Sequence, residues 1–156
     1  MRYRTCLLGF VAAALFIVAA VSAQGKNFNG KWTLDTAKSG PPPGILESAR
    51  PASDFTIKVD DKNFTVTTTR EGADTVMVYK LDGSDSKNIP AGRAARPTVY
   101  NFKWDGDKAV ITATRDAGDE RTEYSLEGDT LVRDTVRPGE KGAAPTRTRT
   151  YFKRAR

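Results

Sequence analysis

The chain has 156 residues, a formal net charge of +6 at pH 7, no histidine and a single cysteine, Cys6. The lack of histidine excludes a Ser-His-Asp triad and an imidazole base. The lack of histidine and cysteine ligands also excludes the ordinary zinc, copper and haem sites. We therefore expect no metal, no cofactor and no enzymatic activity, although composition alone leaves carboxylate, lysine or tyrosine chemistry open.

The N-terminal segment has the layout of a secretory signal peptide. Arg2 and Arg4 form a basic start, an apolar run follows over residues 7–20, and small residues occupy 21–23. The apolar run is shorter than the roughly 20 residues that span a bilayer. The sequence therefore predicts cleavage after Ala23, a periplasmic or secreted protein, and a mature form with no membrane span.

The rest of the chain alternates between apolar and polar residues with a period of two. In 54–59, for example, Phe55 and Ile57 share one face, and Thr56 and Lys58 share the other. Clusters of Gly, Asp and Asn separate such runs, which is typical of strands joined by hairpins. The predicted strands are 30–35, 54–59, 64–69, 75–81, 98–104, 109–114, 121–126, 130–136 and 146–153.

Short turns between consecutive strands predict that neighbours in sequence pair in space. A meander of this kind removes its exposed edges by closing on itself. We therefore expect residues 24–156 to form a single all-β domain, an up-and-down antiparallel barrel of about eight to ten strands. Thr, Lys, Asp and Arg on the outer faces place this barrel in water, and dispersed charges of both signs do not favour a nucleic-acid partner.

Two long segments interrupt the hairpins. Residues 37–53 include a Pro/Gly-rich stretch and one expected turn of helix over Ile45–Ala49, and residues 84–97 form the second loop. Loops of this length are either binding lids or tolerated insertions. At the start of the second loop, 82–88 has oxygen-bearing residues at calcium-like spacing but no closing Glu, so we expect a solvated hairpin tip.

Residues 28–34 read F-x-G-x-W-x-L, with Phe28, Gly30 and Trp32 at the fixed positions. This opening resembles that of the calycin superfamily, the lipocalins and fatty-acid-binding proteins. It resembles more closely a group of exported bacterial lipocalin-like proteins of uncharacterised function. Asp35, Lys38, Ser39 and the Pro/Gly-rich residues 40–44 continue the likeness. The resemblance implies that Trp32 is structural and packs beneath a basic side chain of the last strand, either Arg154 or Arg149.

The last strand also resembles the terminal Arg-x-Tyr strand of fatty-acid-binding proteins, where both side chains point inward and hold a ligand carboxylate. Arg149 and Tyr151 occupy these positions here. An outward orientation is the alternative, because Arg147 and Lys153 would otherwise share the inner face. The remaining candidate ligand-lining residues are apolar or aromatic side chains that either fill a core or line a cavity: Phe55, Ile57, Phe64, Val66, Tyr100, Phe102 and Trp104.

The resemblance and the apolar inner faces together imply an exported, non-enzymatic binder or carrier of a small amphiphilic or hydrophobic ligand. The alternative function is a protein-binding module, an inhibitor or accessory protein that uses its two long loops. An enzyme would need an interior carboxylate or tyrosine with a shifted pKa, and no residue in the sequence stands out as one.

Overall fold

The computed structural model describes residues 27–39, 54–70, 72–90, 96–139 and 143–155. The predicted signal peptide and the helical turn expected over 45–49 lie outside the described residues.

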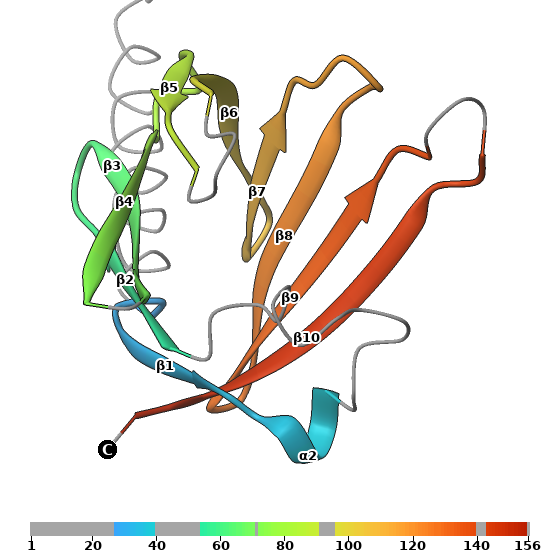
Figure 1. Cartoon of the computed structure of the whole chain (residues 1–156). Coiled ribbons are helices and arrows are strands. Elements are labelled where there is room, and N and C mark those ends of the chain that lie inside the picture. Colours follow the sequence, from blue (N-terminus) through green and yellow to red (C-terminus); the bar gives the residue numbers. More distant parts are fainter. Residues whose placement is uncertain (1–26, 40–53, 71, 91–95, 140–142, 156) are drawn as a thin grey trace, which may run out of the picture.

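Ten antiparallel strands and one short helix make up the described chain. They are β1 (Gly30–Leu34), α2 (Thr36–Ser39), β2 (Asp54–Val59), β3 (Asn63–Arg70), β4 (Ala73–Lys80), β5 (Ser86–Asn88), β6 (Thr98–Asp105), β7 (Lys108–Ala113), β8 (Glu120–Glu127), β9 (Thr130–Arg137) and β10 (Thr146–Arg154). They form one sheet in the order β4-β3-β2-β1-β10-β9-β8-β7-β6-β5. Figure 1 shows this sheet curling into a nearly closed barrel. The prediction of an all-β, up-and-down barrel is confirmed.

Two elements differ from the expectation. The segment Ser86–Asn88, expected to be a solvated tip, is instead strand β5 on the edge of the sheet, with Ser86 and Asn88 buried. The helix α2 directly follows β1, where Asp35 caps it by accepting hydrogen bonds from the backbone N–H groups of Ala37 and Lys38. Both elements are too short to give a periodic pattern.

The hairpin turns follow from local residue chemistry. Gly106 and Gly128 have φ near +60°, a conformation that glycine adopts without steric cost in tight turns. In the β2–β3 turn the Asp60 carboxylate accepts backbone hydrogen bonds from Lys62 and Asn63, each 2.8 Å long. These two bonds lower the pKa of Asp60. Tight turns of this kind pair each strand with the next one along the chain.

The interior of the barrel is densely aromatic. The rings of Phe55 and Phe152 meet edge to face, with centroids 4.8 Å apart, and those of Phe64 and Phe102 lie 5.4 Å apart. The largest fully buried side chains are Trp32, Phe28, Phe64, Phe102, Phe152, Ile57, Leu131, Val110 and Val132. Bulky rings thus fill much of the space that a wide barrel would leave open.

Candidate functional site

One end of the barrel is closed by the opening motif. Trp32 is fully buried, and its Nε1–H donates a 2.9 Å hydrogen bond to the carbonyl of Phe28. The guanidinium carbon of Arg154 lies 4.5 Å from the centre of the Trp32 ring. Its nitrogens also donate to the backbone carbonyls of Asn27 and Asn29. Of the two candidate partners of Trp32, the structure therefore selects Arg154, and the arrangement is a structural plug.

The apolar residues expected to line a ligand site all lie on the inner face of the barrel. Phe55, Ile57, Phe64, Val66, Tyr100 and Phe102 are buried, whereas Trp104 is half-buried. Trp104 packs against Phe28 and Phe64, and its indole N–H has no hydrogen-bond partner within the described residues. Of these seven, only Tyr100 borders the interior pocket described below. The other six pack against one another as core.

The inward orientation considered for Arg149 and Tyr151 is wrong. Phe152 and Thr150 are the buried residues of this part of β10, and alternation therefore puts Arg149 and Tyr151 on the outer face. Arg149 pairs there with Glu127 at 2.6 Å and with Asp134 at 3.7 Å. Neither Arg149 nor Tyr151 can reach a ligand inside the barrel.

A pocket of about 230 Å³ lies at the end of the barrel away from Trp32. The register of β10 defines the two ends, because Thr146 is opposite Arg137 at one end and Arg154 is opposite Trp32 at the other. The pocket is lined by Tyr79, Pro90, Tyr100, Ile111, Ala113, Arg115, Glu120, Thr122, Tyr124 and Arg137. We call this set the mouth pocket. It combines aromatic walls with a charged rim.

The rim of the mouth pocket carries more positive than negative charge. Glu120 forms ion pairs with Arg137, at a nitrogen–oxygen distance of 3.4 Å, and with Arg115 at 3.7 Å. Arg115 also donates a 3.5 Å hydrogen bond to the hydroxyl of Thr98. Two guanidinium groups thus share one carboxylate, which favours an anion over a cation in the pocket.

Two tyrosines of the mouth pocket, Tyr79 and Tyr100, have raised pKa values. Burial raises the pKa of Tyr79 well above the usual tyrosine range, with smaller contributions from the neighbouring Tyr124, Tyr100 and Glu120. Burial also raises the pKa of Tyr100, and the positive charge of Arg115 opposes this shift. Both phenols therefore keep their protons near neutral pH and can donate hydrogen bonds.

A further arginine lies inside the barrel next to this pocket. Arg133 is opposite Tyr124 on β8 and Thr150 on β10, and the buried Thr150 marks its face as the inner one. Its guanidinium carbon lies 5.0 Å from the centre of the Phe152 ring. Within the described residues this half-buried group forms no ion pair and no side-chain hydrogen bond. It is an inward-facing cation with no anionic partner in the part of the chain that the structure describes.

Of the residues that line the mouth pocket, only Tyr100 was predicted from the sequence as a candidate site residue. Six of the ten lining residues come from three separate strands, β7, β8 and β9, and only the register brings Ala113, Glu120 and Arg137 to the same end. The alternation of Glu120, Thr122 and Tyr124 did place them on one face. Their polarity, however, is also typical of an outer face. Combining Tyr124 with the buried Leu131 would have identified that face as interior.

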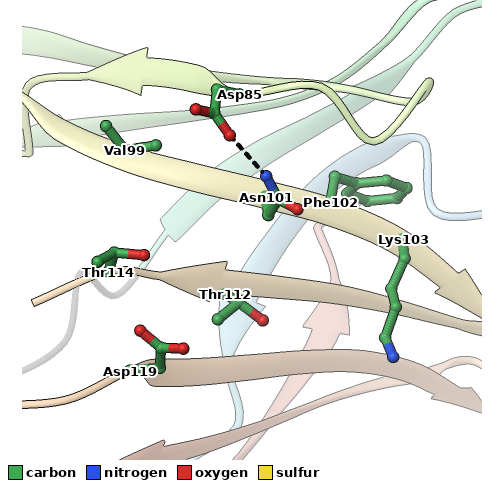
Figure 2. A pocket seen from close by; sticks show the side chains of 8 residues that line it. All are labelled: Asp85, Val99, Asn101, Phe102, Lys103, Thr112, Thr114 and Asp119. Carbon is green, nitrogen blue, oxygen red and sulfur yellow. Dashed lines mark hydrogen bonds between the residues drawn. The ribbon is translucent and has the colours of Figure 1, made fainter.

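A second, larger hollow lies on the outside of the barrel. It measures about 620 Å³ and is lined by Asp85, Val99, Asn101, Phe102, Lys103, Thr112, Thr114 and Asp119. Figure 2 shows these side chains over β6 and β7, with the 2.8 Å hydrogen bond from Asn101 to Asp85. Phe102 is the exception, since its side chain is buried in the core. The hollow has no aromatic wall, so the mouth pocket is the better site for a partly apolar molecule.

Comparisons with known proteins identify the fold. No family profile and no curated protein sequence matches the chain. Solved structures do match. A point mutant of the REP1-NXSQ fatty acid transporter has a TM-score of 0.62 at 16% identity, covering 83% of this chain and 99% of its own. Zebrafish ileal bile acid-binding protein complexed with cholic acid has a TM-score of 0.62 at 17% identity, with the same coverage. Lipid binding protein 8 of Caenorhabditis elegans has a TM-score of 0.59 at 15% identity, covering 83% and 96%.

The fold is that of the calycin-like barrels. Identities this low establish architecture and nothing about the ligand.

Among the described residues, no helix is long and apolar enough to cross a membrane.

Proposed function

We propose that this protein binds a small amphiphilic ligand with an acidic head group inside its barrel, without catalysing a reaction on it. The observation that carries the proposal is Arg133, an inward-facing guanidinium with no anionic partner among the described residues, placed beside the mouth pocket. A half-buried cation loses part of its hydration, and the Phe152 ring replaces only some of that loss. A ligand carboxylate would supply an anionic partner through a bidentate contact.

The surroundings of Arg133 suit the rest of such a ligand. Tyr124 and Tyr79 offer aromatic surface, and Ile111 and Ala113 add aliphatic surface. The hydroxyl of Thr122, which lines the pocket, lies 3.3 Å from that of Thr135, and this residue pair is next along the β8–β9 ladder, on the same face, to Tyr124 and Arg133. These hydroxyls would add polar contacts for a head group. A ligand whose apolar body lies against these walls and whose carboxylate points toward Arg133 would contact both the apolar and the charged part of the site.

The size of the pocket limits the ligand. A volume of about 230 Å³ is below the roughly 300–1,000 Å³ typical of drug-sized sites. It corresponds to about eight water-sized groups. We therefore expect a short-chain or single-ring acid to fit the pocket as it stands, whereas a long-chain lipid would require the aromatic core to rearrange.

Export is part of the proposal, and it is supported by the basic start, the apolar run and the small residues before Gln24. Expression of the full chain in a bacterial host tests it directly. We expect periplasmic protein whose intact mass corresponds to a first residue of Gln24. Protein that stays in the cytoplasm at full length would contradict export. It would not affect the binding proposal, which has its own test.

The binding proposal is tested by titrating the purified barrel with hexanoate and with uncharged 1-hexanol, observed by NMR. We expect hexanoate to shift the resonances of mouth-pocket residues and 1-hexanol to bind at least tenfold more weakly. Arg133→Gln should weaken hexanoate binding about tenfold or more, because it removes a charge-assisted contact. Arg149→Gln is the matched control, since its arginine is on the outer face. Equal losses in the two variants, or equal binding of acid and alcohol, would refute the proposal.

A further inference from the structure

The barrel is closed along one line without a backbone ladder. Everywhere else in the sheet, neighbouring strands form antiparallel ladders, such as the eight residue pairs that join β3 to β4. The sheet ends at β4 on one side and at β5 on the other. We call the contact between these two strands the seam. Within the described residues, the hydrogen bonds that join the two strands across the seam all come from side chains of β5.

Asn88 is the centre of the seam. Its Nδ2 donates to the carbonyl of Val78, and its Oδ1 accepts from the N–H of Val78, both at 2.8 Å. One side-chain amide thus reproduces the pair of bonds that a facing residue makes in an antiparallel ladder. Ser86 adds a third bond, in which its Oγ accepts from the N–H of Lys80 at 2.9 Å. Both side chains are buried.

The seam is held along only half of β4. The N–H groups of Val78 and Lys80 point toward β5, and alternation gives Asp74 and Val76 the same backbone direction. Strand β5 ends at Asn88, so no backbone bond joins Asp74 or Val76 to it within the described residues. Toward that end of β4 no described residue pairs with the backbone of this edge.

The mouth pocket lies directly behind the seam. Tyr79 of β4 and Tyr100 of β6 meet across it edge to face, with ring centroids 5.5 Å apart. Both rings line the pocket, as does Pro90, two residues beyond Asn88. Separation of β4 from β5 would therefore open the pocket sideways, between strands.

The outer side of the seam combines exposed apolar side chains with the exposed Lys80 and Lys87. The large hydrophobic side chains that are exposed in the described part of the chain are Val76, Val78 and Ile89, at 51%, 37% and 58% exposure. Val76 and Val78 belong to β4, and Ile89 follows β5. A molecule with an apolar body would meet these side chains before it reached Tyr79 and Tyr100.

We propose that the seam is the entrance to the mouth pocket and that Asn88 is the residue that holds it shut. This inference rests on the proposed function. Opening breaks three neutral hydrogen bonds and leaves every backbone ladder intact, so it is a local event that does not require unfolding. Asn88 therefore sets the rate at which ligand enters and leaves, with little effect on the affinity of the closed pocket.

Asn88→Ala tests the proposal, and the chain provides a matched control. Asn29 makes the same two-pronged contact with the backbone of Val59, but at the closed end of the barrel. We expect Asn88→Ala to speed hydrogen exchange of the Val78 amide at least tenfold and to raise both the association and dissociation rates of hexanoate at least fivefold. The dissociation constant should change less than threefold. Asn29→Ala should leave the hexanoate rates unchanged.

Asn88→Asp provides a second variant, because it keeps the size of the side chain but replaces the donor to the Val78 carbonyl with a charged acceptor. It should raise the rates in the same direction as Asn88→Ala. The entrance is refuted if Val78 exchanges faster while the hexanoate rates stay at the wild-type values, or if Asn29→Ala raises them equally. Unchanged hydrogen exchange of the Val78 amide in both variants would refute the role of Asn88 in holding the seam shut.

Failure of the proposed function is distinguishable from failure of Asn88 to hold the seam shut, because hydrogen exchange of the Val78 amide is measured without any ligand. If the wild-type protein does not bind hexanoate, both the proposed function and the proposed entrance are refuted. Hydrogen exchange of the Val78 amide still decides whether Asn88 holds the seam shut.

Discussion

Gly30 leaves the space that Arg154 occupies. A Cβ atom at Gly30 would lie 2.8 Å from Nη1 of Arg154, and the φ of Gly30 is +135°, which L side chains rarely adopt. Steric space and backbone conformation therefore explain why position 30 of the opening motif is a glycine. It lets the last strand lay a guanidinium over Trp32.

Gly30→Ala should lower the free energy of unfolding by about 1–3 kcal/mol, through backbone strain and displacement of Arg154. The measurement is urea denaturation followed by tryptophan fluorescence. Because the two residues share one contact, the loss should not add to that of Arg154→Gln in the double variant. Full additivity would contradict the contact.

Arg154→Gln removes the cation over the Trp32 ring and should lower the free energy of unfolding by about 0.5–2 kcal/mol. Arg149→Gln breaks ion pairs on the outer face with Glu127 and Asp134, together with a looser contact in which the guanidinium carbon lies 5.5 Å from the centre of the Tyr151 ring. It should cost about 0.2–1 kcal/mol. The two variants are compared by urea denaturation at the same salt concentration. High salt should abolish most of the Arg149 effect and little of the Arg154 effect. A larger loss for Arg149→Gln would argue against the structural role of Arg154.

Phe64→Leu tests whether the aromatic core limits ligand size. The Phe64 ring lies 5.4 Å from Phe102 and 5.8 Å from Tyr124, between centroids, and Tyr124 lines the mouth pocket. We expect a loss of about 0.5–3 kcal/mol in unfolding free energy and a shift of preference from hexanoate toward longer alkyl carboxylates. Leu131→Val, deep in the core on β9, should destabilise the barrel without that shift. An unchanged chain-length preference in Phe64→Leu would contradict the size limit.

Alkaline pH should destabilise the barrel through Tyr79. Below a pH of about 10 this phenol is neutral in both folded and unfolded chains. Above it, the unfolded chain ionises while the raised pKa of Tyr79 keeps the folded form neutral. Stability therefore falls as pH rises from the unfolded toward the folded pKa. Tyr79→Phe should show a shallower decline between pH 9 and 11 in urea denaturation, and an identical slope would contradict this assignment.

The sequence was sufficient to predict nine of the strands, because alternation and Asp-Gly turns act over a few residues. It could not predict β5, whose residues Ser86, Lys87 and Asn88 are all polar. Burial of Ser86 and Asn88 depends on their bonds to β4, and such bonds leave no periodic trace in the sequence.

The inner face of β10 was harder to predict. Thr148, Arg149, Thr150 and Tyr151 alternate without a clear apolar side, and a shift of one residue exchanges the two faces of a strand. The buried Phe152 decides the direction. The interior arginine is consequently Arg133 on β9, which nothing in its own strand distinguished from an outer charge.

The pairing of β1 with β10 makes the order of strands around the barrel independent of where the polypeptide starts. Joining the ends that flank this pair and cutting the chain at Gly83, between β4 and β5, would produce a circular permutant that runs β5 to β10 and then β1 to β4. Every ladder would then still join consecutive strands. The new termini would lie between β4 and β5, the one pair of consecutive strands in the described chain that no backbone ladder joins.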